Sequence, residues 1–182
     1  MHKSFITTLC CCLLLVAAGN SYAEKPTKGP VFTDYGPVYK IDDLTTPLTE
    51  GLHYKILFDI SKTGETEDQL NRNIESVARF INMHVLHGTK LENIEVAVVL
   101  HGKSTRDGLT HAAYEEKYLV KNPTLDLINQ LHAKGVKFYQ CGQSAYYQNI
   151  NAEDLSEDVN MALSALTMLT ELQADGYSLI SW

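Results

Sequence analysis

Two hydrophobic periods alternate along residues 53–182. Short runs of β-branched and aromatic residues, typical of strands, are separated by longer segments in which apolar residues recur every three or four positions, as in helices. The strand-like runs are residues 53–60, 94–100, 136–140, 159–162 and 177–182, and the helix-like segments are residues 67–86, 122–132 and 163–174. Strands that alternate with helices predict parallel pairing through right-handed crossovers. We therefore expect an α/β fold, a three-layer α/β/α sandwich around a mainly parallel sheet.

Local signals mark the starts of two helices. Thr66 and Gln69 have the spacing of a capping box, which predicts a helix that begins at Glu67. Asn122 followed by Pro123 places a good cap before a residue favoured in the first turn, and so predicts the start of a second helix.

The chain before this pattern divides into two segments. Residues 1–23 have the basic start, short apolar run and small residues near the end that define a cleavable secretory signal peptide. The apolar run is shorter than the roughly 20 residues of a membrane-spanning helix. Residues 24–51 are rich in proline and lack a period, which predicts an irregular arm with a candidate strand only at Pro37–Ile41. We expect a periplasmic or secreted protein, free of the membrane after cleavage, with one domain at residues 52–182.

The net charge and the number of cysteines limit the functions that the protein can have. The net charge is −7, and it becomes −8 without the signal peptide, because Lys3 is the only charged residue there. So acidic a protein is a poor binder of nucleic acid. Three of the four cysteines lie in the signal peptide, which leaves Cys141 alone in an oxidising compartment. Cys141 is then a buried inert thiol, a reactive thiol, or half of an intermolecular disulfide.

Candidate chemistry gathers where strands end, because function in parallel sheets collects at the carboxyl ends of the strands. Cys141 follows one strand and opens the segment Cys141-Gly142-Gln143-Ser144, in which backbone N–H groups can face a thiolate and Gly142 permits a tight, exposing turn. The alternative is an inert cysteine that closes the strand as a small hydrophobe. His101 ends another strand, and it either pairs with the thiol or only caps its own strand.

Two other sites can be drawn on the sequence, and neither is favoured. His84, His87 and His111 suggest a metal, but no cluster of cysteine or aspartate adds ligands. The hydroxyl-rich loop Ser61–Thr66 resembles the phosphate loop of flavodoxins, but Glu65 would repel the phosphate of FMN. We therefore expect no metal and no cofactor.

Several segments together resemble the DsrE/DsrF-like family of small sulfur-relay proteins, over about Tyr54 to Trp182. The segments are Arg79–His84, Val99–Gly102, Asn122–Pro123, Cys141–Ser144, Ala162–Thr167 and Gly176–Tyr177. The resemblance implies a five-stranded, mainly parallel sheet and assembly into trimers or hexamers. It also implies that a cysteine at the position of Cys141 accepts sulfur as a persulfide and hands it to a partner.

On this resemblance the protein is expected to be an exported persulfide acceptor and carrier that works in sulfur oxidation or relay. Cys141 would carry the sulfur, with a protein or a small sulfur compound as donor and acceptor. Arg79 or His101 would offset its charge, and Gly142, Gln143, Ser144 and Asn122 would line the pocket. The alternative is a non-catalytic oligomeric module of the same fold that binds a small ligand or a partner.

Overall fold

A computed structural model describes residues 25–181, so the predicted signal peptide and Trp182 lie outside the described residues. Five strands form one sheet, in which every neighbouring pair is parallel. They are β1 (Tyr54–Ile60), β2 (Ile94–Leu100), β3 (Lys137–Cys141), β4 (Val159–Ala162) and β5 (Ser178–Ser181), in the spatial order β4-β3-β2-β1-β5. The predicted α/β fold with a five-stranded sheet is confirmed.

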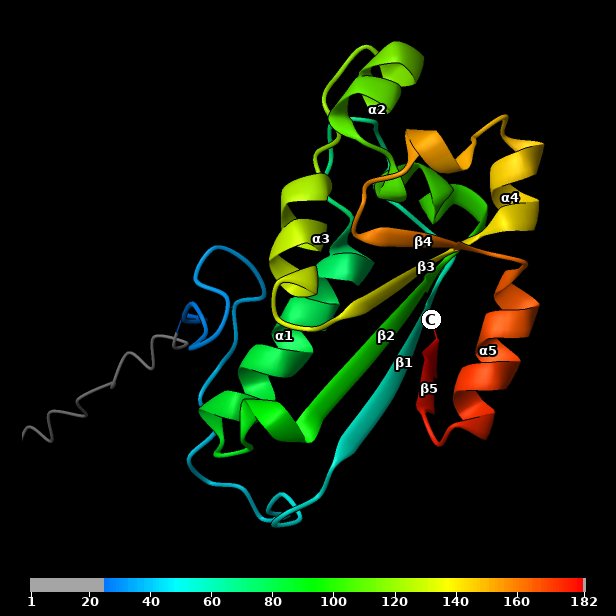
Figure 1. Cartoon of the computed structure of the whole chain (residues 1–182). Coiled ribbons are helices and arrows are strands. Elements are labelled where there is room, and N and C mark those ends of the chain that lie inside the picture. The colour runs from blue at the N-terminus through cyan, green and yellow to red at the C-terminus, as the bar shows by residue number, and fades with distance from the viewer. Residues whose placement is uncertain (1–24, 182) are drawn as a thin grey trace, which may run out of the picture.

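Helices cover both faces of this sheet (Figure 1). They are α1 (Arg72–Leu86), α2 (His111–Tyr118), α3 (Leu125–His132), α4 (Gly142–Tyr147) and α5 (Ala165–Ala174). The chain steps in one direction from β1 through β2 and β3 to β4, and right-handed crossovers therefore place α1 and α3 on the same face. The last connection runs back across the sheet from β4 to β5, so α5 covers the opposite face. The helices α2 and α4 lie beyond the carboxyl ends of the strands.

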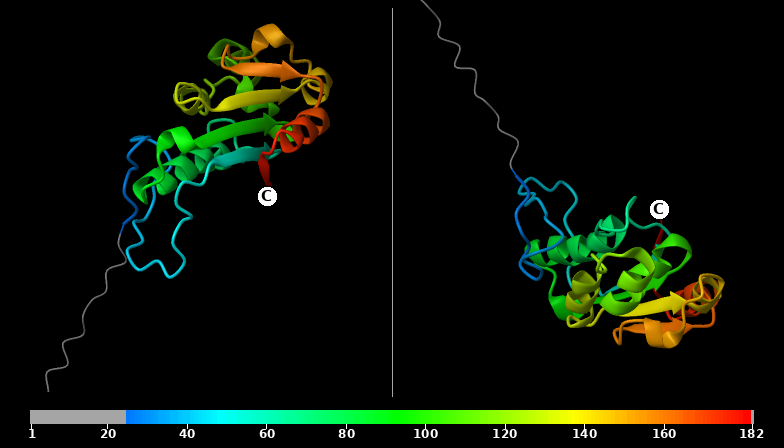
Figure 2. Two further views of the ribbon diagram at one scale, coloured as in Figure 1. Left: turned by 60° about the horizontal axis from the view of Figure 1, so that its bottom comes forward. Right: turned by 90° about the horizontal axis from the view of Figure 1, so that it is seen from above.

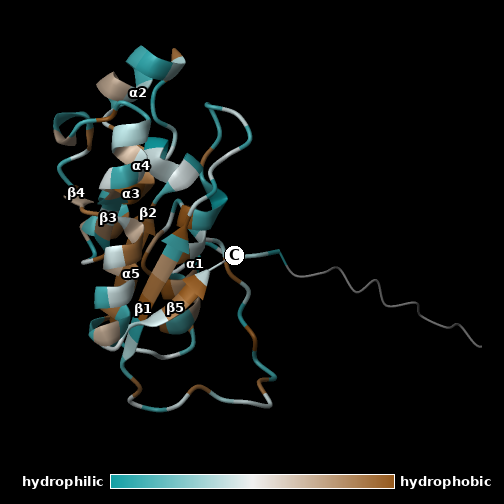
Figure 3. Cartoon of the chain, turned by 90° about the vertical axis from the view of Figure 1, so that its right-hand side faces the viewer, coloured by the Kyte–Doolittle hydropathy of each residue, from teal (hydrophilic) through white to brown (hydrophobic). Residues whose placement is uncertain are grey.

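The core has two parts, one on each face of the sheet. The larger cluster lies between the sheet and the helices α1 and α3, and the smaller one lies beneath α5. The central strand β2 is buried on both faces from Val96 to Leu100, which explains why its sequence is apolar without alternation. Figure 3 shows the hydrophobic residues concentrated in the strands, whereas the helices carry hydrophobic and hydrophilic residues together.

Two predicted helix starts are wrong. The helix expected from Glu67 begins at Arg72, because Asn71 caps it by accepting from the N–H groups of Asn73 and Ile74. The side-chain oxygen of Gln69 instead accepts a hydrogen bond from the N–H of Glu65.

The helix expected from Asn122 begins at Leu125. The Asn122 side-chain oxygen accepts from the N–H of Thr124, while its amide donates to the carbonyls of Asp107 and Leu109. Asn122 therefore stabilises the turn before α3 and binds the backbone at Asp107 and Leu109 to it.

One helix and three short 3-10 turns were not predicted from the hydrophobic pattern. The helix α2 buries only Tyr114, so it has no apolar stripe to reveal it. Three 3-10 turns connect other elements, at Leu91–Asn93, Gly102–Gly108 and Ala152–Asp154. Cys141 is the last residue of β3 rather than the first residue after it.

The arm is irregular, and it packs along α1 (Figure 2). The candidate strand at Pro37–Ile41 is reduced to an isolated bridge between Val38 and Thr27. Phe32 and Val38 are buried in the domain, with 2% and 3% of their surfaces exposed. Although most of the arm is polar or exposed, these two side chains tie it to the core.

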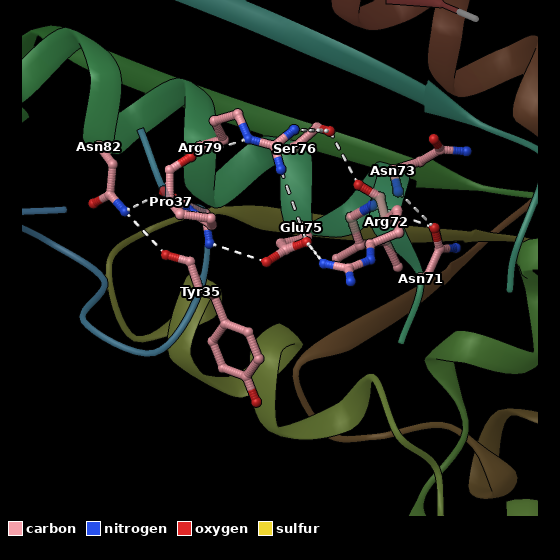
Figure 4. A network of polar contacts seen from close by, with 11 residues as sticks. Tyr35, Pro37, Asn71, Arg72, Asn73, Glu75, Ser76, Arg79 and Asn82 are labelled. Atoms are coloured by element: carbon pink, nitrogen blue, oxygen red, sulfur yellow. Dashed lines mark hydrogen bonds and ion pairs between the residues drawn. The ribbon is translucent and has the colours of Figure 1, made fainter. Parts of the chain in front are cut away.

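One buried asparagine on α1 holds the arm in place (Figure 4). The side-chain oxygen of Asn82 accepts from the N–H groups of Val31 and Phe32, and its amide donates to the carbonyls of Phe32, Tyr35 and Gly36. Gly36 has a φ of +62°, and a Cβ there would lie 2.4 Å from the backbone nitrogen of Arg79. The chain can approach α1 this closely only with glycine at that position.

We predict that Asn82→Ala lowers the free energy of unfolding by roughly 3 kcal/mol, because it leaves several buried backbone groups of the arm without partners. Urea denaturation followed by circular dichroism measures the loss, and limited proteolysis should show earlier cleavage in residues 25–51. Asn73→Ala on the same helix is the control, with a loss within about 1 kcal/mol. Equal stability of the Asn82 variant and the wild type would contradict this role.

Candidate functional site

Cys141 lies at the carboxyl edge of the sheet, where β3 ends and α4 begins. It belongs to the cluster beneath α5, together with Leu57, Val99 and Ala165, and 5% of its surface is exposed. It is the one cysteine among residues 25–181, and its thiol is free. The thiol is therefore placed on the α5 face of the sheet, near the surface but largely covered.

Hydrogen-bond donors from two helix starts converge on the Cys141 sulfur. Burial is the largest single influence on the thiol and raises its pKa. The hydroxyl of Ser144 and the backbone N–H groups of Ser144, Ala165 and Gln143 act against it, and together they lower the pKa below the ordinary value of 9.0. Gln143 and Ser144 lie in the first turn of α4, and Ala165 opens α5. The site therefore favours the thiolate, as helix N-termini do for reactive cysteines.

Ser144 connects the cysteine to the end of β2. Its side-chain oxygen accepts from the N–H of Gly102 at 3.2 Å, which leaves the hydroxyl proton free for the sulfur. Gln148, just after α4, donates to the carbonyl of the same glycine at 2.8 Å. These two bonds fix α4 against the turn that follows His101.

Gly142 is required here for a different reason from the one predicted. Its φ is not positive, but a Cβ on it would lie 2.5 Å from the carbonyl oxygen of Ala162 and 3.2 Å from that of Leu163. The glycine thus lets the β4–α5 connection pass directly beside α4. It brings the start of α5 to the sulfur and does not expose the thiol.

His101 lies on the same edge of the sheet and has an orienting partner that the sequence did not reveal. Its Nε2 is 2.7 Å from an oxygen of Asp59 on β1, and the other oxygen of Asp59 accepts from the hydroxyl of Ser181 on β5 at 3.0 Å. Leu100 pairs with Gln140, so His101 and Cys141 follow each other in register across β2 and β3. The one sequence signal for this partner was Asp59 itself, a single carboxylate near the end of the otherwise apolar run Ile56–Ile60.

Two predicted pocket residues lie elsewhere. Arg79 is on α1, on the other face of the sheet, where its guanidinium bonds the carbonyl of Pro37 in the arm. Asn122 is buried among the backbone groups of Asp107 and Leu109. The structure thus gathers Cys141, Gly142, Gln143, Ser144 and His101 at one edge, and it separates Arg79 and Asn122 from them.

Comparison with known proteins identifies the family of this domain. The DsrE/DsrF-like family matches residues 55–182. The chain belongs to the DsrE/DsrF-like family. Among solved structures, it is similar to the protein of unknown function MTH1491 from Methanobacterium thermoautotrophicum, with 18% identity and a TM-score of 0.51 over 71% of this chain and 99% of that one. This likeness supports the fold alone. A search of curated proteins finds no match.

The family match begins at Lys55, so the arm precedes the matched region. The arm packs on α1 through the larger core cluster, whereas Cys141 belongs to the smaller cluster on the other face of the sheet. His87 near the end of α1 also contacts the arm, by accepting from the N–H of Ile41.

The other histidines considered as metal ligands are dispersed. His84 bonds the carbonyl of Phe80 within α1, and His111 begins α2. Across residues 25–181, no three His, Cys, Asp or Glu side chains are grouped so that they could hold a metal ion. None of the helices in this range has the length and apolar character needed to cross a membrane.

The surface next to Cys141 is apolar. One pocket between α4 and the β4–α5 connection is lined by Gly142, Gln143, Tyr146, Ala162 and Leu163. Tyr146, Tyr147, Leu163 and Leu166 around it are between 71% and 89% exposed. The DsrE/DsrF-like domain therefore presents large exposed apolar side chains close to its free cysteine.

A buried carboxylate supports the same edge of the sheet from the α1 side. One oxygen of Asp107 accepts from the hydroxyls of Thr63 at 2.8 Å and Thr124 at 3.3 Å, and the other accepts from the amide of Asn71 at 2.7 Å. Burial raises the pKa of Asp107 from 3.8 to about 6, although these hydrogen bonds act in the opposite direction. Asp107 thereby joins the β1–α1 loop to the starts of α1 and α3.

We predict that Gly142→Ala disturbs the cysteine site, because the new methyl group collides with the carbonyl of Ala162. The β4–α5 connection must move away, which removes the Ala165 N–H from the sulfur and raises the thiol pKa. Alkylation of Cys141 at pH 7 should slow by roughly tenfold, the effect of one pKa unit.

Gly108→Ala is the matched control. A Cβ at Gly108 finds its nearest neighbours at 3.4 Å, which is ordinary contact, so alkylation should keep the wild-type rate. Equal rates in the wild type and both variants would show that the close approach at Gly142 is not needed.

We predict that Asp107 makes stability fall as the pH rises. A carboxyl group whose pKa is raised by folding contributes stability that is fully present below about pH 3.8 and is lost as the pH passes through about 6. Between pH 4 and pH 7, the wild type should lose on the order of 3 kcal/mol relative to Asp107→Asn.

Urea unfolding of both proteins at several pH values measures this difference, in which the contributions of the other acidic groups cancel. A difference that stays constant, or grows in favour of the wild type with pH, would contradict the raised pKa of Asp107.

Proposed function

We propose that this protein is an exported sulfur carrier that accepts a sulfane sulfur atom on Cys141 and hands it to a partner. The observation that carries the proposal is the convergence of the Ser144 hydroxyl and three backbone N–H groups on one sulfur atom, with a lowered pKa. Membership of the DsrE/DsrF-like family, with its sulfur-relay character, supports the same chemistry.

The proposed step is a transfer between sulfur atoms. The Cys141 thiolate attacks the terminal sulfur of a donor persulfide or polysulfide, and a new S–S bond forms as the donor's S–S bond breaks. The electron pair of the broken bond leaves with the donor as a thiolate. No external oxidant or reductant is required. A second thiolate later takes the terminal sulfur from Cys141 in the same way and releases the cysteine.

The hydrogen bonds on the sulfur suit both states of the carrier. A persulfide is an anion near neutral pH like the thiolate, so the N–H and O–H donors that stabilise the one also stabilise the other. The attachment of a further sulfur needs space, and the pocket lined by Gly142, Gln143 and Leu163 adjoins the cysteine.

The partners in this proposal are proteins or small sulfur compounds. The exposed Tyr146, Tyr147 and Leu163 beside Cys141 offer an apolar contact surface for a donor or acceptor protein. We also propose assembly into a trimer or hexamer, for which light scattering of the purified protein is the test. Export by residues 1–23 forms part of the proposal, and N-terminal sequencing of the mature protein would test cleavage after Ala23.

The burial of the thiol favours one other function. A cysteine that is only 5% exposed is also compatible with a non-catalytic module, in which the same pocket binds a small ligand or partner and the thiol is inert. The two functions differ in the chemical behaviour of Cys141.

We predict that the mature protein, incubated with polysulfide at pH 7, gains the mass of one or more sulfur atoms, which dithiothreitol removes. Intact-mass spectrometry measures the gain. Cys141→Ser should gain nothing, because the carrier atom is absent, and Ser76→Ala on the exposed face of α1 should behave like the wild type.

A wild-type protein that gains no mass, and whose thiol is alkylated only after unfolding, would overturn the carrier function. That result would leave the binding module as the function of the domain.

A further inference from the structure

A short row of polar side chains crosses the sheet beside Cys141. Ser181 of β5 donates to Asp59 of β1, and Asp59 contacts Nε2 of His101 at the end of β2. The side chains of Asp59 and His101 are 19% and 29% exposed, so both are partly withdrawn from water. The row comes from three different strands and ends one strand away from the cysteine.

The chemistry of the contact determines which nitrogen of His101 carries the proton. A carboxylate can only accept hydrogen bonds, so a neutral imidazole that bonds Asp59 through Nε2 must carry its proton there. The Ser181 hydroxyl occupies the second oxygen of Asp59 and holds the carboxylate in this orientation. Nδ1 is left as the basic nitrogen of the ring.

The position of His101 in the sheet puts its side chain on the same face as the thiol, one strand away. Val99 of β2 and Cys141 of β3 share the cluster beneath α5. Because side chains alternate along a strand, His101 lies on the same face as Val99, and neighbouring strands are about 4.8 Å apart. The Ser144 hydroxyl also joins the backbone after His101 to the sulfur region.

We infer that Asp59 is a positioning residue of this site: it holds the Nε2 proton of His101, so that Nδ1 accepts the proton of the Cys141 thiol. This inference rests on the proposed sulfur-carrier function and extends it. The Cys141 S–H bond breaks, its electron pair stays on the sulfur, and the proton moves to Nδ1 to give a thiolate and an imidazolium. When a partner removes the carried sulfur, the imidazolium can return the proton to the departing Cys141 thiolate.

Few other charges surround this pair. Lys62 and Lys103 lie in the loops after β1 and β2. The helix α4, the β4–α5 connection, the first six residues of α5 and the strand β5 contain no charged residue. Asp59 is therefore the anionic side chain that faces His101 among these elements.

The pH profile of Cys141 alkylation by iodoacetamide, an uncharged reagent, tests the inference on the mature protein. We expect His101→Asn to lower the rate at pH 6.5 by about tenfold or more, with rates that converge with the wild type near pH 9, where the thiol ionises unaided. Asp59→Asn should shift the profile in the same direction. Asp175→Asn, which removes an equal charge beside Lys55 at the start of β1, should leave it unchanged.

A pH midpoint that is the same in the wild type, His101→Asn and Asp59→Asn would overturn the inference. Should either variant fail to fold, nitrogen-15 NMR of the wild type decides: a proton on Nε2 of His101 is expected, and a proton on Nδ1 alone would overturn it.

These outcomes are distinct from a failure of the proposed function. Alkylation reports on the thiol proton whether or not a sulfur atom is ever accepted. A shifted pH profile without mass gain from polysulfide would remove the carrier function alone, and mass gain with an unshifted profile would remove the role of Asp59 alone.

Discussion

Parallel pairing of the five strands is the constraint on which the rest of the structure depends. It requires a crossover after each strand, so helices must cover both faces, and it directs every strand's carboxyl end to one edge of the sheet. Side chains that are distant in the sequence, such as Asp59, His101, Cys141 and Ser181, therefore lie at the same edge. The return of the chain across the sheet brings the start of α5 to the same edge.

The cysteine site is a balance between burial and hydrogen bonding. Burial alone would keep Cys141 protonated and inert, as it does for many core cysteines. The hydroxyl of Ser144 and the backbone N–H groups of Ser144, Ala165 and Gln143 reverse that effect. Gly142 is central to this balance, because it permits the approach of the β4–α5 connection. These hydrogen-bond donors therefore favour an anion on the Cys141 sulfur.

The sequence predicted the sheet well because strand signals are local. Five apolar runs and the turns between them were enough for the strand positions, and continuous burial of β2 follows from its unbroken apolar run. Helix starts were less predictable. Asn71 caps α1 while Thr124 and Asp107 hold it from elsewhere in the chain, and such long-range bonds leave no mark on a short window of sequence.

In the candidate site, too, residues with a local sequence signal were predicted, and residues that depend on long-range contacts were not. Cys141, His101 and the residues just after the cysteine were found because they lie at the ends of predicted strands. Arg79 was grouped with them on its position in the sequence alone, and the crossover through α1 places it on the other face. Asp59 and Ser181 were missed because their partnership with His101 depends on the spatial order of β5, β1 and β2, which alternation of apolar residues does not reveal.

Spectroscopic titration of the Cys141 thiolate, followed by its ultraviolet absorbance with Cys141→Ser as the baseline, tests the central claim most directly. The account predicts a midpoint below 9.0 in the wild type and a higher midpoint in Ser144→Ala, which lacks the donating hydroxyl. A wild-type midpoint at or above 9.0, unchanged by Ser144→Ala, would contradict it, because burial would then outweigh the donors around the sulfur.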